Sequence, residues 1–352
     1  MFSWDNLPNQ ILGNALPLLL LLVFFLHRIR TTSTNTKPID PPPTVPITTL
    51  QWMKARLGND YPLKSLAWSR QANTPVYQLV TKIHTLVHTT DVHLMRQILL
   101  DPNTTKPSGA YEVLRNTHDG GKDIITDNGI FWKHSRKGVA PAFSKANLTR
   151  MTKVVEEQVK KFIEMRVRPM LRNEGQVMDV CQEMVQLTLR VICEAAFEYT
   201  MSDEEQQLVG HGFTVTIREG VKSLVIPLRS KLGRYLCRET REAEEASLQL
   251  VELGFKILKS HRLMKNPTRG TVIDYIAQNT NYESDKERVN DILIFLFAGH
   301  DTTAYSLSWT LLELAKKPEE QRLLREELLK HDQEDWTHVK RLKNVAKEGM
   351  GG

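Results

Sequence analysis

Residues 289–315 read VNDILIFLFAGHDTTAYSLSWTLLELA, and this stretch decides the fold class of the chain. Its apolar residues recur every three and four positions, which is the spacing of one face of an α-helix, and phenylalanines fill the other faces. The pattern predicts a helix over residues 287–316 that runs through the core of a mainly helical protein. The positions that carry the pattern are Val289, Ile292, Leu293, Leu296, Leu307, Leu311 and Leu314.

Three residues in the middle of this helix interrupt the apolar pattern. Burying Asp301 without a partner would be costly, since even an uncharged polar group costs roughly 2–7 kcal/mol. Gly299 lowers helix propensity by about 1 kcal/mol relative to alanine, which is tolerable where a ligand approaches the backbone. Thr302 can turn its hydroxyl onto the carbonyl one turn earlier and so loosen the helix. Together these residues predict a polar notch that accepts water or a diatomic molecule.

The same stretch carries a resemblance to a known family. AGHDTT at residues 298–303, followed by SLSWTLLELAKKPEEQRLLREEL, resembles the distal central helix and the next helix of the cytochrome P450 family, the haem-thiolate monooxygenases. Residues 178–199, MDVCQEMVQLTLRVICEAAFEY, are similar to a core helix of that family. A six-residue motif alone also fits a buried helix with a capped aspartate, so the resemblance rests on several segments in family order.

A second polar pair lies in FWKHSRKGVAPAFS, residues 131–144. Trp132 and Arg136 are four residues apart and therefore share one face of a helix. An indole N–H beside a guanidinium can bind a carboxylate, which arginine holds with two parallel hydrogen bonds. The resemblance implies that this W-x-x-x-R pair binds a haem propionate. The alternative is an exposed cation–π pair, worth roughly 0.5–1 kcal/mol.

The amino end predicts a membrane anchor. Residues 7–26 are uncharged and mostly apolar, and about 20 such residues in a helix span one bilayer. Arg28 and Arg30 follow, so the positive-inside rule places the remaining chain on the cytosolic side. We predict an uncleaved anchor over residues 1–30, because the basic start and the small-residue cleavage site of a signal peptide are missing. The proline-rich residues 31–50 predict a semi-rigid, extended hinge.

The rest of the chain predicts helices with one small sheet. Residues 74–90 alternate apolar and polar side chains over two β-branched runs, which predicts a hairpin or a pair of strands. Asp91 can cap the helix that follows, and residues 103–129 read as an irregular loop. The fold class is therefore mainly α with a small β-sheet near the N-terminus, and residues 51–352 would form one incomplete cytochrome P450 catalytic domain. The helical patterns cover residues 131–140, 144–172, 177–199, 203–220, 238–261, 271–279, 287–316, 318–331 and 336–350.

Composition excludes some classes of function. With 352 residues, of which 41% are hydrophobic, the chain can bury a large core. Its formal net charge of +6 suits an anionic membrane surface or an acidic protein partner, and no motif supports binding to nucleic acid. Cys181, Cys193 and Cys237 lack the spacing of a zinc site or a redox pair, so we predict reduced, cytosol-facing thiols and no metal site.

The carboxyl end departs from the family pattern. THVKRLKNVAKEGM, residues 337–350, resembles the helix with the family's E-x-x-R ion pair; Glu348 stands at the acid position, but Gly351 stands at the arginine position. The family's axial cysteine, whose thiolate binds the haem iron, follows that helix, and no cysteine of this chain has its context. We interpret the sequence as truncated, a fragment or a gene-model error. A buried, unpaired Glu348 would cost about 3–5 kcal/mol, so we predict marginal stability and an inactive chain as written.

The resemblance implies a function for the family as a whole. That function is haem-dependent monooxygenation of an apolar substrate, of the fatty acid, sterol or terpenoid class, with O₂ and electrons from NADPH-cytochrome P450 reductase. Asp301 would relay protons, Thr302 would donate a hydrogen bond to the oxygen, and Ala298 and Gly299 would line the haem. The implied location of such a microsomal enzyme is the endoplasmic reticulum membrane, with the catalytic body in the cytosol. The alternative is a pseudoenzyme or a membrane-anchored helical binding protein without catalysis.

Overall fold

The computed structural model describes residues 41–58, 60–81, 85–172, 177–226, 228–330 and 339–349. These residues form two compact units: one takes the chain up to Thr104 together with Val221–Leu232, and the other takes Thr105–Gly220 and the chain from Gly233 onward. The predicted anchor over residues 1–30 lies outside the described residues, as does the predicted hinge up to residue 40. Within the described ranges, no helix combines the length and the apolar character needed to cross a membrane.

The first unit is built on a three-stranded sheet with the order β1-β2-β3. β1 (Thr44–Val45) pairs parallel with β2 (Val76–Val80), which pairs antiparallel with β3 (Thr85–Thr89). The hairpin predicted within residues 74–90 is therefore confirmed. β1 falls inside the range 31–50 that predicts a hinge, so the last part of that range belongs to the sheet.

Three helices complete the first unit: α2 (Thr49–Leu57), α3 (Tyr61–Ala72) and α4 (Val92–Leu100). The predicted cap of α4 is confirmed, because the Asp91 carboxylate accepts hydrogen bonds from two backbone N–H groups at 2.8 and 3.0 Å. The spacing of apolar residues does not predict α2 or α3, since each buries only one or two side chains. The core of this unit consists of Val45, Ala55, Trp68, Tyr77 and Leu79.

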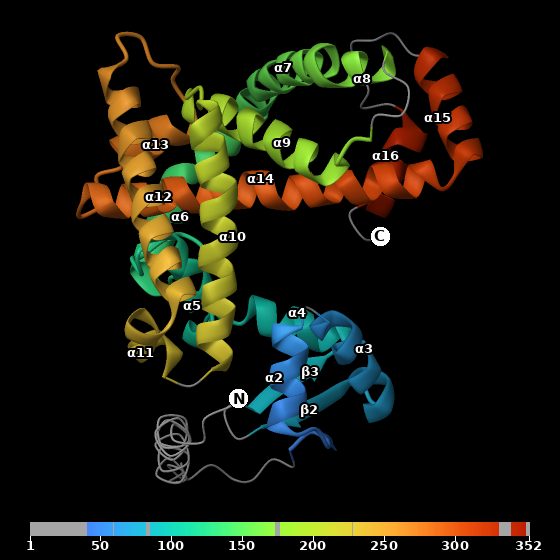
Figure 1. The fold of residues 1–352 in the computed structure, drawn as a ribbon, viewed down its shortest axis with the longest axis vertical. Helices are drawn as coiled ribbons and strands as arrows, with labels where there is room; N and C mark the ends of the chain where they lie inside the picture. The colour runs from blue at the N-terminus through green and yellow to red at the C-terminus, as the bar shows by residue number, and fades with distance from the viewer. Residues whose placement is uncertain are drawn as a thin grey trace, which may run out of the picture. The chain divides into compact units, whose positions relative to one another are not determined.

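The second unit is helical. Figure 1 shows its longest helix, α14 (Asp285–Ala315), with α9 (Val180–Phe197) packed against it and α12 (Arg238–Leu263) crossing it. α10 (Asp203–Val225) and α11 (Arg229–Leu236) contribute residues to both units. The remaining helices are α5 (Ser108–Arg115), η2 (Asn116–His118), α6 (Gly129–Val139), η3 (Ala140–Phe143), α7 (Lys145–Phe162), η4 (Ile163–Val167), α8 (Arg168–Arg172), α13 (Val272–Gln278), α15 (Pro318–Lys330) and α16 (Lys340–Gly349).

The core of the second unit lies where α9, α12 and α14 meet. A methyl group at Gly254 of α12 would lie 2.6 Å from Val289 of α14, so a glycine at this position lets the two helices approach closely. The predicted fold class, mainly α with a small sheet near the N-terminus, is confirmed. Side chains from all three helices are at most 1% exposed here: Leu189, Phe197, Leu250, Ile257, Ile292 and Leu293.

Two predictions about the second unit need correction. Residues 103–129 are not one irregular loop, because α5 and η2 form within them. The helix predicted over residues 287–316 is present, but its second part is buried on one side only, where Ala304 packs into a small core cluster with Phe162, Met184 and Leu187. In its second part Tyr305, Trp309 and Leu312 are 49%, 58% and 46% exposed. A periodic apolar pattern shows which face a helix can bury; the pattern does not show whether a neighbouring element covers that face.

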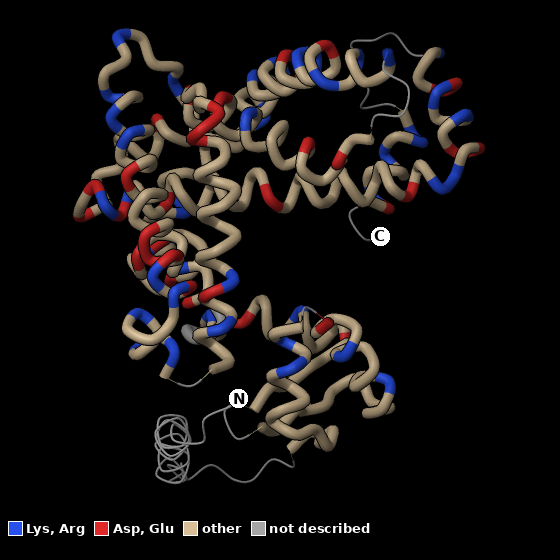
Figure 2. Tube along the Cα trace, in the orientation of Figure 1, with Lys and Arg blue, Asp and Glu red and all other residues tan. Residues whose placement is uncertain are grey.

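The long helices of the second unit each carry both positively and negatively charged side chains. In Figure 2 the Lys and Arg segments alternate with Asp and Glu segments along α12 and α15. Several of these charges pair within one helix turn, as Arg322 does with Glu319 and Glu326 on α15. Exposed pairs of this kind contribute little to stability, so the fold depends on its apolar contacts.

Candidate functional site

The hydrogen bond predicted for the Thr302 hydroxyl is present on α14. The hydroxyl of Thr302 donates a hydrogen bond to the carbonyl oxygen of Ala298, one turn earlier, at 2.8 Å. Ser306 repeats this bond to the carbonyl of Thr302 at 2.9 Å. A hydroxyl that donates in this way keeps its lone pairs as acceptors. Since Thr302 is exposed, its hydroxyl oxygen is accessible to a proton donor from outside the helix.

Asp301 is half-buried and makes no hydrogen bond or ion pair with another described residue. Burial raises the pKa of its carboxyl, and the neighbouring His300 opposes that shift only in part. Ala298 and Tyr305 lie three and four residues away and therefore share its helix face. A carboxyl whose pKa is raised can hold and release a proton closer to neutral pH than a solvated one. Asp301 is therefore suited to hold a proton at the surface of α14.

Gly299 has a packing role in the structure. A methyl group at this position would lie 2.7 Å from the Cδ1 and Cγ1 atoms of Ile192, which reaches across from α9. Close packing of α9 on α14 is therefore sufficient to explain why a glycine interrupts the apolar run. The role of Gly299 and Ala298 as haem-lining residues stays a prediction.

We expect Gly299→Ala to lower the free energy of unfolding by about 1–2 kcal/mol, because overpacking against Ile192 outweighs the gain in helix propensity. In the double variant Gly299→Ala/Ile192→Ala, the removed side chain leaves room for the new methyl group. The combined loss should therefore be smaller than the sum of the two single losses by about 1 kcal/mol. Urea denaturation of the four proteins measures this coupling. Additive losses would show that the two residues do not restrain each other.

The predicted pair on α6 forms. The guanidinium carbon of Arg136 lies 5.9 Å from the ring centroid of Trp132, and Arg136 is exposed while Trp132 is half-buried. Neither the guanidinium nor the indole N–H has a hydrogen-bond or ion-pair partner among the described residues. The pair therefore presents unengaged donors, which is what a carboxylate ligand requires.

Lys106 is a third donor group beside this pair. Its ammonium nitrogen lies 5.2 Å from the ring centroid of Trp132 and donates hydrogen bonds to the carbonyls of Asp127 at 2.7 Å and Ile124 at 3.4 Å. Burial lowers the pKa of Lys106, two nearby aspartates oppose that shift, and Arg136 adds to it. An anion bound between Lys106 and Arg136 would offset the repulsion between the two cations.

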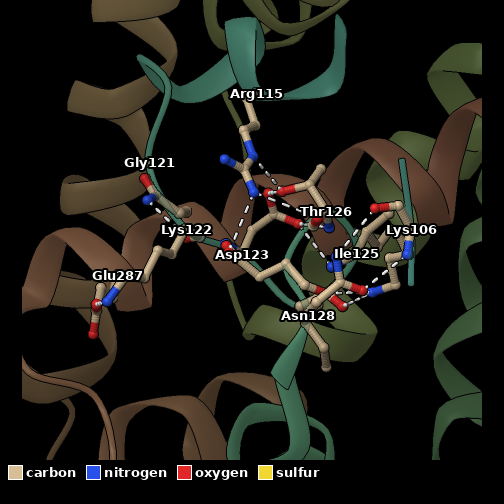
Figure 3. Close-up of polar contacts among 12 residues, drawn as sticks. Lys106, Arg115, Gly121, Lys122, Asp123, Ile125, Thr126, Asn128 and Glu287 are labelled. Carbon is tan, nitrogen blue, oxygen red and sulfur yellow. Dashed lines mark hydrogen bonds and ion pairs between the residues drawn. The ribbon is translucent and has the colours of Figure 1, made fainter. Parts of the chain in front are cut away.

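The loop before α6 is organised around a buried carboxylate (Figure 3). Asp123 is 0% exposed; its Oδ1 accepts hydrogen bonds from the backbone N–H groups of Ile125 and Thr126 at 2.7 and 2.8 Å. Its Oδ2 accepts the hydroxyl of Thr126 and lies 3.2 Å from Nε2 of His118. Burial alone would raise the pKa of Asp123, but the hydrogen bonds from His118 and Thr126 outweigh burial and hold the pKa below its ordinary value.

Side chains on either side tie this loop to the start of α6. Arg115 donates to the hydroxyl of Thr126 at 3.0 Å (Figure 3). It also pairs with Asp127 at 3.2 Å. The side chain of Asn128, the residue before α6, accepts from the backbone N–H of Lys106 at 3.0 Å and donates to its carbonyl at 3.2 Å. The position of Lys106 is therefore coupled to the first turn of α6.

α14 also holds this loop, through a second buried acid. Asp291 is 0% exposed; one oxygen accepts the backbone N–H of Ile124 at 2.7 Å, and the other contacts the hydroxyl of Tyr282. Burial raises the pKa of Asp291 to about 7; its hydrogen bonds with Tyr282 and Ile124 oppose the shift, and the charges of Asp123 and Glu287 add to it. Burial therefore makes the protonated form of Asp291 more favourable than it is for a solvated aspartate.

Sequence patterns do not single out Lys106, Asp123 or Asp291. Asp291 does carry a signal, since it interrupts the apolar run of α14 ten residues before Asp301 in the same way. Lys106 and Asp123 lie in a stretch whose composition indicates a loop, and no local spacing distinguishes them from solvated charges. Their roles become visible only through contacts between segments that are distant in sequence.

The expected burial of Glu348 is not found. Glu348 is exposed on α16 and lines an open cavity of about 1010 Å³ between α14, α15 and α16. The lining combines charged side chains, such as Glu313, Lys317 and Arg341, with the apolar side chains of Leu314 and Val345. Because the carboxylate is solvated, the argument that an orphaned, buried Glu348 makes the chain marginally stable is wrong.

Comparisons with known proteins agree with these observations. The model of the family described as Cytochrome P450 matches residues 40–350. A cytokinin hydroxylase of Arabidopsis thaliana is 25% identical over 257 residues, which is 68% of this chain and 48% of that protein. Cytochrome P450 4Z1 of Homo sapiens is 23% identical over 251 residues, which is 66% of this chain and 48% of that protein.

A bacterial relative and a solved structure extend the comparison. Cyclooctatin synthase of Streptomyces melanosporofaciens is 24% identical over 203 residues, covering 56% of this chain and 43% of that protein. The crystal structure of the cytochrome P450DA heme domain superposes with a TM-score of 0.65 at 21% identity, covering 89% of this chain and 70% of that chain. That likeness shows the fold. The chain spans about half the length of the curated relatives that it matches.

Proposed function

The chain belongs to the cytochrome P450 family, and from this premise we propose that the protein is a haem-dependent monooxygenase that hydroxylates an apolar substrate. The observation that carries the proposal is the group of unengaged donors on α6: the Trp132 indole and the Arg136 guanidinium, 5.9 Å apart, with the Lys106 ammonium beside them. Because the relatives are about twice as long as the matched region, the activity is proposed for the whole protein.

The described residues include donors that could bind the propionate carboxylates of a haem. Trp132 and Arg136 have no protein acceptor among the described residues, so they are free to bind the propionates, and Lys106 would add a third donor. The iron ligand is not assigned to any of the three cysteines. Cys193 is buried in the core of the second unit, and burial raises the pKa of its thiol.

The haem, when bound, would supply the oxidation chemistry, and the protein would supply binding and protons. We propose that the Asp301 carboxyl holds a proton at the face of α14 and releases it to water, and that the Thr302 hydroxyl takes a proton from that water as it gives up its own, Asp301 being reprotonated from solvent. Two observations support this role: burial raises the pKa of Asp301, and the Thr302 hydroxyl keeps free lone pairs because its proton is directed to the carbonyl of Ala298. Ala298 has a small side chain and leaves room against the same face.

Substrate, partner and location follow from the family and from the sequence. We propose an apolar substrate of the fatty acid, sterol or terpenoid class and electron supply by NADPH-cytochrome P450 reductase. The relatives named as a cytokinin hydroxylase and a cyclooctatin synthase show that the family accepts different substrates, so the choice within these classes stays open. The apolar residues 7–26 support a microsomal location with a single anchor in the endoplasmic reticulum membrane.

Binding of metal-free protoporphyrin IX tests the proposal without requiring an iron ligand. We expect Arg136→Gln to weaken binding by about 10- to 100-fold, because charge-assisted hydrogen bonds contribute roughly 1.5–3 kcal/mol. Quenching of tryptophan fluorescence during titration measures the dissociation constant. Lys133→Gln removes an exposed charge from the same helix and should leave the affinity unchanged. No binding by the unaltered chain, or equal affinities for both variants, would refute the assignment of the carboxylate site.

A further inference from the structure

Asp291 is a buried acid that the proposed function does not use. It lies on α14 ten residues before Asp301, and both of its oxygens contact elements next to α6. One oxygen accepts the backbone N–H of Ile124 at 2.7 Å, and the other contacts the Tyr282 hydroxyl. Two separate chains of contacts connect the Asp291 carboxyl to the first turn of α6. This turn carries Trp132.

The first route passes through the loop of Figure 3. Ile124 gives its N–H to Asp291, and its carbonyl accepts a hydrogen bond from the ammonium of Lys106 at 3.4 Å. The backbone of Lys106 is in turn bonded on both sides by the side chain of Asn128, at 3.0 and 3.2 Å. Because Asn128 is the residue before α6, a shift of Ile124 would be transmitted to Lys106 and to the start of that helix.

The second route passes through an aromatic contact. The ring of Tyr282 packs edge-on against the ring of Phe131, with centroids 6.2 Å apart and an interplanar angle of 65°. Phe131 precedes Trp132 on α6. Since the Tyr282 hydroxyl is held by Asp291, the same carboxyl restrains the ring that supports this turn of the helix.

α14 also contacts the loop through Asn290, the residue before Asp291. The side chain of Asn290 donates to the carbonyl of Lys122 at 2.9 Å. Gly121 leaves the space that this contact requires, because a methyl group there would lie 2.0 Å from the Asn290 amide nitrogen. Consecutive residues of α14 therefore hold consecutive parts of the loop, with Asp291 bonded to the part nearest Lys106.

We propose that Asp291 is a positioning residue for the carboxylate-binding donors, which sets the orientation of Trp132 and Arg136 through Ile124 and Tyr282. This inference rests on the proposed function, since it takes these two residues as the donors to the porphyrin carboxylates. The charged side chains around Asp291 have other partners: Asp123 pairs with His118, and Lys122 pairs with Glu287 at 3.5 Å and lies 5.6 Å from the ring centroid of Phe131. Arg288 lies 5.4 Å from the ring centroid of Tyr282. None of them replaces Asp291 as the acceptor for Ile124.

Two porphyrins that differ only in their carboxyl groups test the inference. Protoporphyrin IX has two free carboxylates, whereas its dimethyl ester has none, so only the first depends on the orientation of the donors. We expect Asp291→Ala to weaken binding of the free acid by about tenfold, the equivalent of one charge-assisted hydrogen bond, and to leave the affinity for the ester unchanged. Asp291→Asn keeps an acceptor for Ile124 and a polar group at Tyr282, so it should retain the affinity for the free acid.

A matched control separates positioning from general destabilisation. Leu293→Ala removes a fully buried side chain of α14 that packs against α12, so it lowers stability without touching the loop. Its ratio of acid to ester affinity should equal that of the unaltered chain. The inference is overturned if Asp291→Ala weakens both porphyrins equally, or leaves the free acid unaffected while Arg136→Gln weakens it; the proposed function survives in both cases. If the unaltered chain binds neither porphyrin, both are overturned.

Discussion

Replacing Asp123 with alanine is expected to lower the free energy of unfolding by about 3–5 kcal/mol, the cost of breaking a fully buried charge network. The carboxylate is 0% exposed and accepts hydrogen bonds from Ile125 and Thr126 while His118 lies 3.2 Å away. Alanine would leave the backbone N–H groups of Ile125 and Thr126 without this acceptor and would remove the charge beside His118. Urea denaturation followed by circular dichroism measures the loss as a lower transition midpoint.

Two further variants make this test specific. Asp119→Asn changes a 63%-exposed acid at a left-handed turn of the same loop, which asparagine also tolerates, and should shift stability by at most about 0.5 kcal/mol. Because the pKa of Asp123 is lowered in the folded state, its contribution is complete above the unfolded pKa of about 3.9 and is lost as the pH falls through the lower folded value. Asp123→Asn should lack this acid-dependent loss. A loss below about 1 kcal/mol for Asp123→Ala would contradict the proposed role of the network.

Replacing Asp301 with asparagine is expected to lower hydroxylation by about 100-fold or more in protein that carries haem and receives electrons from a reductase. Asparagine keeps the shape of the side chain but cannot release a proton at neutral pH. The half-buried carboxyl, whose pKa is raised by burial, is suited to that transfer beside Thr302. The measurement is product formed per minute at saturating substrate, with haem content determined for each variant.

Thr302→Ala is the companion variant. It removes the hydroxyl oxygen that would receive the proton, so consumption of NADPH should continue while product falls, and the ratio of the two reports the uncoupling. Glu313→Gln serves as the control, since Glu313 lies on the same helix in an exposed pair with Lys316 at 2.8 Å and should leave the rate unchanged. Unchanged hydroxylation by Asp301→Asn, or tightly coupled turnover by Thr302→Ala, would exclude the proton-relay role.

Much of the secondary structure could be predicted because its determinants are local. Periodic apolar residues locate most helices of the second unit, and the alternation over residues 74–90 locates the hairpin of β2 and β3. The back-bonded hydroxyl of Thr302 and the proximity of Trp132 to Arg136 follow from spacings of four residues. Helices α2 and α3 could not be predicted in this way, since they bury too few side chains to leave a periodic pattern.

The parts of the candidate site that the sequence does not predict depend on contacts over long sequence separations. Ile124 and Asp291 are 167 residues apart, and Asn290 and Lys122 are 168 apart, so no local pattern relates them. Within residues 103–129, the polar network is fixed to α14 by Asp291, which accepts from Ile124, and by Asn290, which donates to Lys122. In the same way, the sequence alone predicts that an aspartate in a loop is solvated, and only the structure shows its hydrogen-bond partners.

By itself the sequence determined the mainly helical class, the family and the residues of the notch and the α6 pair, because periodicity, capping and short motifs act over a few positions. Only the tertiary structure decided that Ile192 occupies the space beside Gly299, that Glu348 is solvated, that Tyr305 and Trp309 of α14 are exposed, and that Asp291 reaches the loop before α6. The physical reason is that burial and the pairing of polar groups are properties of surfaces brought together by folding. The free energy of burying or pairing a polar group depends on the groups that surround it, and the sequence of a single segment does not specify those groups.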